Sequence, residues 1–397
     1  MTTQDTPLPG QAAPHSPETE EQRSWLRLLR FSKLGAAGLR HAVDLAGNAV
    51  SLVNGGPELW RQAGIDDEGL RALGSRETTN PEDLAWLRGP NRHLIGWDSE
   101  DYPALLRRGP NPPPALFVVG DPTLLWRPQI AVVGSRNPSP GGRDNATAFA
   151  RGLARDGWLV SSGLADGVDA AAHRAALDAG QPTLAVVGTG PDRVYPASNR
   201  ALAEDIAANG AIVSEFLPGT GARREHFPRR NRILAGLSLG TLVIEAGTRS
   251  GALITARLAG ECGRETFAIP GSIHNPMARG CHQLIRQGAA LVETVQEVVD
   301  ALAPVAAELA DALRARLGNG DASGQADDST RQSAPPANTD DPEYQRLWDA
   351  LGHDPIGIDA LAERTGLTVD TLSSMLLLME LDGRVSSHQG RYARHAT

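Results

Sequence analysis

Residues 130–136 decide the fold, and they read Ile130-Ala131-Val132-Val133-Gly134-Ser135-Arg136. The uninterrupted apolar run predicts a strand that is buried on both faces of a sheet. It ends in Gly-Ser-Arg, and Pro140-Gly141-Gly142 then leads into a helical pattern. A strand that turns through glycine into a helix is typical of open α/β sheets, which bind ligands at the carboxyl ends of their strands.

The same pattern recurs along the middle of the chain. Six more short apolar runs alternate with helical stretches, and they lie at 158–161, 183–187, 211–213, 241–244, 266–269 and 289–292. Uniformly apolar strands separated by amphipathic helices indicate a parallel sheet covered on both faces. The sequence therefore predicts an α/β domain over residues 101–316, with a Rossmann-like, doubly wound and mostly parallel sheet of about seven strands.

Smaller units flank this domain. Residues 22–100 show short helical segments broken by glycine, which predicts a small all-α domain of the SAM or helix-hairpin-helix type. Residues 342–397 show helical patterns at 344–351, 358–364 and 367–381 and then a hairpin, which predicts a winged helix-turn-helix domain. Residues 1–21 are expected to be a disordered acidic tail and residues 317–341 a flexible acidic linker, because large apolar residues are scarce there.

The net charge of −9 does not exclude a nucleic-acid partner. Residues 1–21 and 321–343 carry −4 and −5, so the remainder of the chain is neutral. Lys33 is the only lysine, so nearly all positive charge is carried by arginine. The guanidinium group makes bidentate hydrogen bonds to phosphate and stacks on bases. With two cysteines, no secretory signal and no membrane-length apolar run, we expect a cytoplasmic protein without a disulfide framework.

The densest chemical signal is the stretch from Arg223 to Arg232, which holds five arginines and one acid. Arginines follow phosphates, and Phe227 among them offers a surface on which an unpaired base can stack. Asn231 can pair with a base edge. The alternative is a solvated helix start whose arginines form ion pairs.

Two strand ends add to this signal. After residue 133, Arg136 and the free amides of the following helix could hold a phosphate, although glycine after a strand is often only a turn. After residue 244, the segment Gly247-Thr248-Arg249-Ser250-Gly251-Ala252 again opens a helix. Small residues and arginines at several strand ends predict one groove that suits a polyanion better than a small cofactor.

Other chemistries find less support. Gly188-Thr189-Gly190 fails the dinucleotide fingerprint, and no P-loop sequence occurs. Asp166, Asp169 and His173 could be metal ligands, but aspartates early in a helix more often cap its amides. No nucleophile, base and orienting residue stand at a spacing that assigns catalytic roles. We therefore expect no metal, no cofactor and no catalytic residues.

Taken in order, these segments resemble the DprA family, also called Smf or DNA-processing proteins. The matching residues are Gly134-Ser135-Arg136, Ser162-Gly163 through Asp169 to His173, Tyr195-Pro196 with Asn199, Ser214-Glu215, Phe227 to Arg232, Glu245-Ala246, Arg249 to Ala256 and Ile269-Pro270-Gly271. The match is close over residues 100–295. One departure is Gly280-Cys281-His282, where many members have Gly-Thr/Ser-Asn, which leaves a polar role for His282 in doubt.

The resemblance implies a protein that binds single-stranded DNA, forms a homodimer through its Rossmann-like domain and loads RecA recombinase during natural transformation, without being an enzyme. It implies these nucleic-acid-binding residues: Gly134, Ser135, Arg136, Ser162, Gly163, Arg224, Phe227, Arg229, Arg230, Asn231, Arg232, Ser250, Gly251 and Thr255. The predicted recognition helix at 367–381 contains no arginine, so duplex DNA would meet only weak phosphate contacts from Arg384, Arg391 and Arg394.

Two other functions remain open. Phosphoribohydrolases of nucleoside monophosphates use the same class of sheet, and Glu245 lies at a strand end as their glutamate does. Their Pro-Gly-Gly-x-Gly-Thr motif is replaced here by Leu237-Ser238-Leu239-Gly240-Thr241. The third possibility is a regulatory scaffold that acts through its winged helix.

Overall fold

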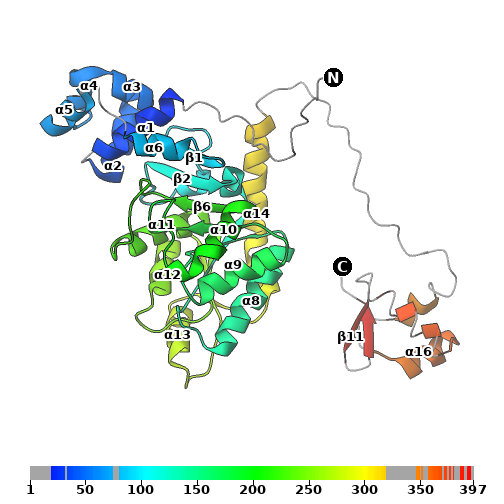
Figure 1. Cartoon of the computed structure of the whole chain (residues 1–397). Helices are drawn as coiled ribbons and strands as arrows, with labels where there is room; N and C mark the ends of the chain where they lie inside the picture. Colours follow the sequence, from blue (N-terminus) through cyan, green and yellow to red (C-terminus); the bar gives the residue numbers. More distant parts are fainter. Residues whose placement is uncertain are drawn as a thin grey trace, which may run out of the picture. The chain divides into compact units, whose positions relative to one another are not determined.

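The computed structural model describes residues 19–31, 34–74 and 80–318, and in the C-terminal part 346–348, 350–351, 356–368, 371–372, 375–376, 379, 385–388 and 391–394. The chain forms two compact units, Met1–Gly320 and Asp321–Thr397, and each is considered by itself (Figure 1). Residues 1–18 of the predicted acidic tail and residues 319–341 of the predicted linker lie outside the described residues.

Six short helices form the N-terminal part of the first unit. They are α1 (Glu20–Phe31), α2 (Gly35–Ala46), α3 (Ala49–Asn54), α4 (Gly56–Gln62), α5 (Asp67–Gly74) and α6 (Pro81–Leu87). Asn48 and Asn80 cap α3 and α6 by accepting hydrogen bonds from backbone amides. Buried tryptophans, Trp25 among them, pack with Phe117 of the neighbouring sheet, so the helices share a core with the domain that follows.

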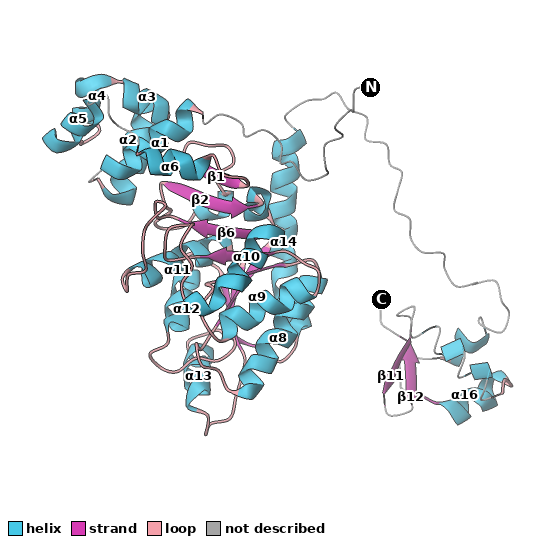
Figure 2. Ribbon diagram, in the orientation of Figure 1, coloured by secondary structure: helices cyan, strands magenta, loops and turns pink. Residues whose placement is uncertain are grey.

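A nine-stranded sheet forms the centre of this unit, in the order β1-β2-β6-β5-β4-β3-β7-β8-β9 (Figure 2). The strands are β1 (Arg92–Gly96), β2 (Ala115–Gly120), β3 (Gln129–Val133), β4 (Leu159–Ser162), β5 (Thr183–Val186), β6 (Ala211–Ser214), β7 (Gly240–Val243), β8 (Glu265–Ala268) and β9 (Ala290–Leu291). All seven predicted runs form strands, and neighbours from β6 to β9 pair in parallel. The predicted doubly wound, mostly parallel sheet is confirmed.

The sheet is longer than predicted because two antiparallel strands extend it. β1 pairs with β2, and β2 pairs with β6, with Phe117 opposite Ser214. β1 lies inside the range 22–100 that the sequence assigned to the helical domain, so the sheet begins earlier than residue 101. At the other end, α14 (Val295–Gly318) runs two residues into the predicted linker.

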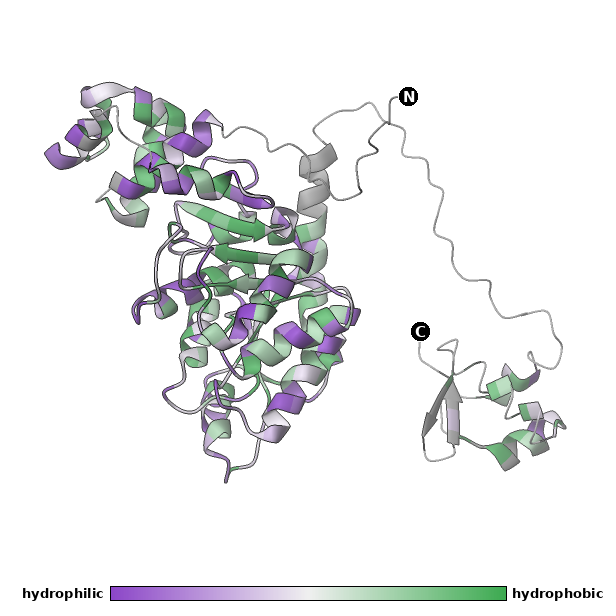
Figure 3. Cartoon of the chain, in the orientation of Figure 1, coloured by the Kyte–Doolittle hydropathy of each residue, from purple (hydrophilic) through white to green (hydrophobic). Residues whose placement is uncertain are grey.

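Helices cover both faces of the sheet because the side chains of each strand alternate between them. In β3, Ala131 and Val133 pack with α11 (His226–Leu237), α12 (Gly251–Glu261) and α13 (Arg279–Arg286). Ile130 and Val132 pack with α8 (Pro140–Arg155), α9 (Val168–Asp178) and α14 on the other face. Colouring by hydropathy shows hydrophobic strands between helices that mix hydrophobic and hydrophilic residues (Figure 3).

The strand order places a crevice at one point of the sheet. β3 lies between β4 and β7. From β3 the chain adds β4, β5 and β6 on one side. It then returns through α11 and adds β7, β8 and β9 on the other side of β3. Strands on either side of this point are followed by helices on opposite faces, which leaves room outside the carboxyl ends of β3 and β7. The Gly-Ser-Arg and Gly-Thr-Arg-Ser-Gly segments both follow strands at this switch point.

The second unit has a small sheet in the order β10-β12-β11. Its described elements are β10 (Ile356–Gly357), α16 (Ile358–Thr365), β11 (Val385–His388) and β12 (Arg391–Arg394). A core that includes Leu361, Leu372 and Val385 joins them. The predicted winged-helix domain is confirmed, with β11 and β12 as the hairpin. Only part of the predicted helix at 367–381 is described, and Arg384 lies outside the described residues.

Within the described residues, no helix combines the length and apolar character that crossing a membrane requires.

Candidate nucleic-acid interface

A pocket of about 880 Å³ lies at the switch point, and we call it the strand-end pocket. The ends of β3 and β4, the loop after β7, the loop before α11, and helices α11 and α12 line it. It gathers eleven of the fourteen predicted binding residues: Gly134, Ser135, Arg136, Gly163, Arg224, Phe227, Arg230, Asn231, Ser250, Gly251 and Thr255. Residues 134 and 255, far apart in the chain, thus share one cavity.

The Gly-Ser-Arg turn packs closely against the backbone at the end of β7. A Cβ atom at Gly134 would lie 2.9 Å from the carbonyl oxygen of Glu245, so only glycine allows this approach to the end of β7. The Ser135 amide donates to that same oxygen at 2.7 Å, and its hydroxyl accepts from the Asn137 amide at 3.1 Å. Ser135 therefore shapes the turn, while the exposed side chain of Arg136 reaches the pocket.

The helix that follows Gly-Ser-Arg, α8, has a carboxylate at its N-terminus. Ser139 caps α8, and the buried carboxylate of Glu245 accepts from the Ser139 amide at 2.8 Å and from its hydroxyl at 2.6 Å. A carboxylate from the end of β7 therefore lies at the positive end of the helix, where the sequence predicted a phosphate. The helix whose N-terminus does open on the strand-end pocket is α12, at Ser250 and Gly251.

Glu245→Gln is expected to lower the free energy of unfolding by about 1–3 kcal/mol, because one acceptor of the α8 cap becomes a donor that faces another donor. The side chain also accepts from Asn275 Nδ2 at 2.9 Å. Chemical denaturation measures the change, and Glu265→Gln at an exposed site on β8 is the control. Unchanged stability of the Glu245 variant would contradict a capping role.

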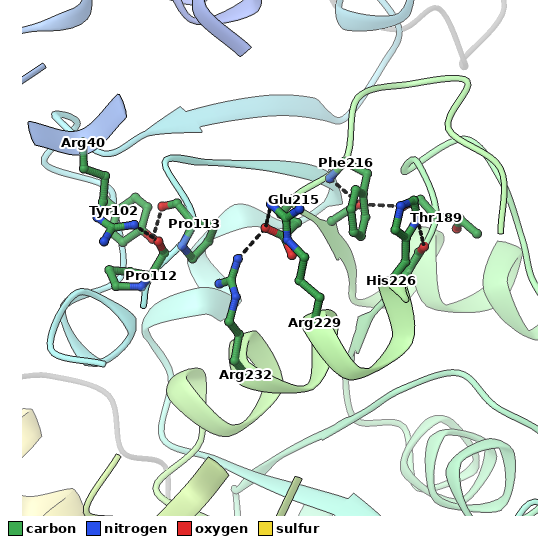
Figure 4. Close-up of polar contacts among 12 residues, drawn as sticks. Arg40, Tyr102, Pro112, Pro113, Thr189, Glu215, Phe216, His226, Arg229 and Arg232 are labelled. Carbon is green, nitrogen blue, oxygen red and sulfur yellow. Dashed lines mark hydrogen bonds and ion pairs between the residues drawn. The ribbon is translucent and has the colours of Figure 1, made fainter. Parts of the chain in front are cut away.

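Helix α11 divides its arginines between two faces. Phe227, Arg230 and Asn231 line the strand-end pocket. Arg229 and Arg232 do not, because both form ion pairs with Glu215 at the end of β6, and Figure 4 shows the two side chains converging on it. Arg229 and Arg232, both predicted as binding residues, thus lie outside the strand-end pocket, because helical spacing turns them toward a buried carboxylate.

Glu215, Arg229 and Arg232 form a cluster where the sheet, α11 and the N-terminal helices meet (Figure 4). The Glu215 side chain is 1% exposed, and burial lowers the pKa of the Arg232 guanidinium beside it. Nearby, Tyr102 donates to the Pro113 carbonyl at 2.7 Å, and Arg40 of α2 donates to the Pro112 carbonyl. These contacts connect α2 to the sheet domain. They give Arg40, Arg229 and Arg232 structural partners.

Two further predicted residues have internal hydrogen bonds. Ser162 is buried, its hydroxyl donates to the Val132 carbonyl at 2.6 Å, and it does not line the pocket. Asn231 Oδ1 accepts from Arg230 Nε at 3.1 Å, and Asn231 Nδ2 donates to the Gly251 carbonyl at 3.4 Å. Ser162 is thus a core residue, and the Asn231 amide connects α11 to α12.

Aromatic and cationic side chains meet at the rim. Phe227 packs against the backbone of Gly188, and the Tyr195 ring lies 5.4 Å from it between centroids. The Arg136 guanidinium lies 5.8 Å from the Phe227 ring centre. Arg249, in the predicted strand-end segment Gly247 to Ala252, lines the pocket, and so does Tyr195, which the prediction did not assign to the site. The signal for Tyr195 is its exposed ring beside Phe227, which only the structure shows.

The three residues considered as metal ligands have separate partners. Asp166 accepts from Ser198 at 2.8 Å, and Asp169 accepts from the amides of Gly163 and Ala165. His173 Nδ1 lies 2.8 Å from the Thr183 hydroxyl, and burial lowers the pKa of His173 to about 3. Across the described residues, no three histidine, cysteine or acidic side chains gather as a metal-binding group.

Comparison with known proteins gives consistent matches. The profile of the DNA recombination-mediator protein A family matches residues 93–303, and that of the DprA winged helix domain matches residues 331–391. The chain is 39% identical to Protein Smf of Escherichia coli over 93% of its length and 95% of that protein. It is 46% identical to the DNA processing protein DprA of Streptococcus pneumoniae, over 51% of its length and 69% of that protein.

A solved structure also matches. The X-ray structure of DNA processing protein A from Streptococcus pneumoniae superimposes with a TM-score of 0.63 and 34% sequence identity. The alignment covers 72% of this chain and 98% of that one.

Proposed function

The chain belongs to the DNA recombination-mediator protein A family, also called DprA or Smf, and from this premise we propose that it binds single-stranded DNA in the strand-end pocket. One observation carries the proposal. Four arginines, Arg136, Arg224, Arg230 and Arg249, line a pocket to which Asp169 is the sole acidic contributor. Such a concentration of guanidinium groups favours a polyanion.

The rim arginines are available to a ligand. Arg136, Arg224 and Arg249 are exposed, and within the described part of the chain none of them forms an ion pair. Each can therefore contact a phosphate without first leaving a carboxylate. Contacts of this kind release condensed counterions, which makes the affinity depend on salt.

Single strands fit this rim better than duplexes. The faces of Phe227 and of the 48% exposed Tyr195 can stack on bases only if those bases are unpaired. The winged helix offers few contacts to a duplex, because residues 367–381 contain acids and no arginine.

The proposal extends to the context in which such a protein acts. We infer that it is a non-enzymatic factor of natural transformation that forms a homodimer through the sheet domain and loads RecA on the bound strand. This inference rests on family membership. It is tested by measuring RecA filament formation on strands that carry a single-strand-binding protein, with and without this protein.

The phosphoribohydrolase alternative depends on Glu245. That carboxylate is buried and hydrogen-bonded to Ser139 and Asn275, and it faces a separate cavity of about 160 Å³. A group held this way is not free to act on a ligand in the strand-end pocket. Incubation with nucleoside monophosphates is expected to release no base, and released base would overturn the non-enzymatic proposal.

Titration with oligo-dT at several salt concentrations tests the main proposal. We expect binding that weakens linearly in log Kd against log salt, with a slope of about 0.7 for each phosphate contacted. A duplex of equal length should bind more weakly, because its bases cannot reach Phe227. Absence of oligo-dT binding at low salt, or stronger binding to the duplex, would contradict the proposal.

A further inference from the structure

A second hollow, of about 500 Å³, lies between α8 and α9, and we call it the α8–α9 groove. Its lining includes Arg136, Arg143, Thr147, Ala170, Ala171 and Arg174. The two helices lie side by side (Figure 1), on the face of the sheet opposite to α11 and α12. Of the predicted binding residues only Arg136 lines this groove, so the sequence did not assign this surface to DNA.

The α8–α9 groove continues from the strand-end pocket, because Arg136 lines both. The Val168 amide at the start of α9 donates to the Ser135 carbonyl at 3.1 Å, and a Cβ atom at Gly167 would lie 2.4 Å from the same oxygen. Each helix between parallel strands carries the chain back from the carboxyl end of one strand to the start of the next. The first turns of α8 and α9 therefore lie at the edge where the pocket opens, and a strand that leaves the pocket over Arg136 enters the groove there.

Arg143 supplies a cation at this end of the groove. It is exposed in the first turn of α8, and among the described residues no ion pair or hydrogen bond engages its guanidinium. The Thr147 hydroxyl, one turn further on, donates to the Arg143 carbonyl at 3.0 Å, so Arg143 and not Thr147 is free to donate to a ligand. Asp166 is the acid at this end, and it accepts from Ser198 at 2.8 Å. Arg136 and Arg143 therefore give the pocket end of the groove a net positive charge, which attracts a phosphate.

The far end of the groove does not favour a polyanion. Arg174 forms an ion pair with Asp205 at 2.8 Å, which uses its charge within the protein. Asp178, the last residue of α9, adds an exposed carboxylate to the lining. Between the two ends, Ala170 and Ala171 present only methyl groups to the groove. The distribution of charge thus favours a short extension of the strand at the pocket end over a path along the whole groove.

We propose that a strand bound in the strand-end pocket continues over Arg136 into the pocket end of the α8–α9 groove, where Arg143 contacts a phosphodiester outside the pocket. The extension rests on the proposed function, since its ligand is the same single strand. It directs the strand across the carboxyl edge of the sheet, from the face of α11 and α12 to the face of α8 and α9. Strands too short to leave the pocket cannot reach Arg143, so its contribution to affinity depends on strand length.

Arg143→Gln tests the extension in titrations with oligo-dT of increasing length, from a tetranucleotide to a strand six times as long. The shortest strand that binds should bind the variant and the wild type equally. The longest should bind the variant about twofold to fivefold more weakly, the range for an exposed ion pair, and its salt slope should fall by about 0.7. Arg155→Gln is the matched control, because Arg155 is exposed on the same helix and lines neither hollow. It should match the wild type at every length.

A thiol placed in the groove gives a measurement that does not depend on the Arg143 variant. Ala171 is half-buried in the first turn of α9 and lines the groove. Cys281 is buried, and Cys262→Ser removes the other native thiol. In that background, the Ala171→Cys thiol should react with a maleimide several-fold more slowly under saturating long oligo-dT than under the saturating shortest strand. Ala148→Cys, at an exposed site on α8 outside the groove, should react at the same rate with either strand.

The results separate the extension from the proposed function. If Arg143→Gln binds long strands as the wild type does, or if long strands leave the Ala171→Cys thiol unprotected, the extension is wrong and binding in the pocket stands. If the variant loses affinity equally at every length, Arg143 acts on the pocket, and the extension is again wrong. If the wild type binds oligo-dT of no length, the proposed function fails and the extension fails with it. Loss of affinity and thiol protection that both appear only with long strands support the extension.

Discussion

Arg136→Ala combined with Arg224→Ala is expected to remove most of the affinity for oligo-dT and to flatten its salt dependence. Both side chains are exposed at the rim of the strand-end pocket, and they come from the end of β3 and from the loop before α11. Each phosphate contact contributes about 0.7 to the slope of log Kd against log salt for single strands, so losing two should reduce the slope by about 1.4. Fluorescence anisotropy at four or more salt concentrations measures both quantities.

The control for this pair must carry the same change in net charge. Arg155 at the end of α8 and Arg200 at the start of α10 (Arg200–Asn209) are exposed and do not line the strand-end pocket. Their double alanine variant should bind oligo-dT nearly as the wild type does. If both double variants lose affinity equally, the effect comes from overall charge and the pocket is not the binding site.

Phe227→Ala is expected to weaken oligo-dT binding by about 1–3 kcal/mol with an unchanged salt slope, because a lost stacking contact involves no counterion. The ring is half-buried against Gly188 and the Tyr195 ring, so it is held in place before a base arrives. The same titrations that measure the arginine variants give this value.

A strand that contains abasic sites provides the control for Phe227. Without bases there is nothing to stack, so wild type and Phe227→Ala should bind abasic strands with equal affinity. Phe227→Tyr keeps the aromatic face and should retain affinity for oligo-dT. If Phe227→Ala instead flattens the salt slope as the arginine variants do, the ring acts by positioning Arg136, whose guanidinium lies 5.8 Å from its centre.

Sequence patterns predicted the parallel part of the sheet well because each of its strands is uniformly apolar. β1 and β2 escaped prediction because they join the sheet through antiparallel pairs between distant segments: β1 pairs with β2, and Phe117 of β2 lies opposite Ser214 of β6. The composition of β1, with Arg92 and His93 at its start, does not distinguish a strand from a loop.

The grouping of site residues was also predictable in outline, because the carboxyl ends of neighbouring parallel strands meet at one edge. The orientation of individual side chains was not. Arg229 and Arg230 are adjacent in the chain, yet one pairs with Glu215 and the other lines the pocket. Which face of α11 meets which neighbour depends on Glu215 and Gly163, both supplied by other strands.

The sequence by itself determined that Gly134-Ser135-Arg136 ends a buried strand and that arginines with one aromatic residue gather near the same edge, because apolar periodicity and strand polarity are local properties. The tertiary structure alone decided which groups line the strand-end pocket. Glu245, 106 residues from Ser139, takes the N-terminus of α8, and α12 opens on the pocket in its place. Which helix N-terminus opens on the pocket depends on contacts between residues far apart in the chain, and local sequence patterns do not predict such contacts.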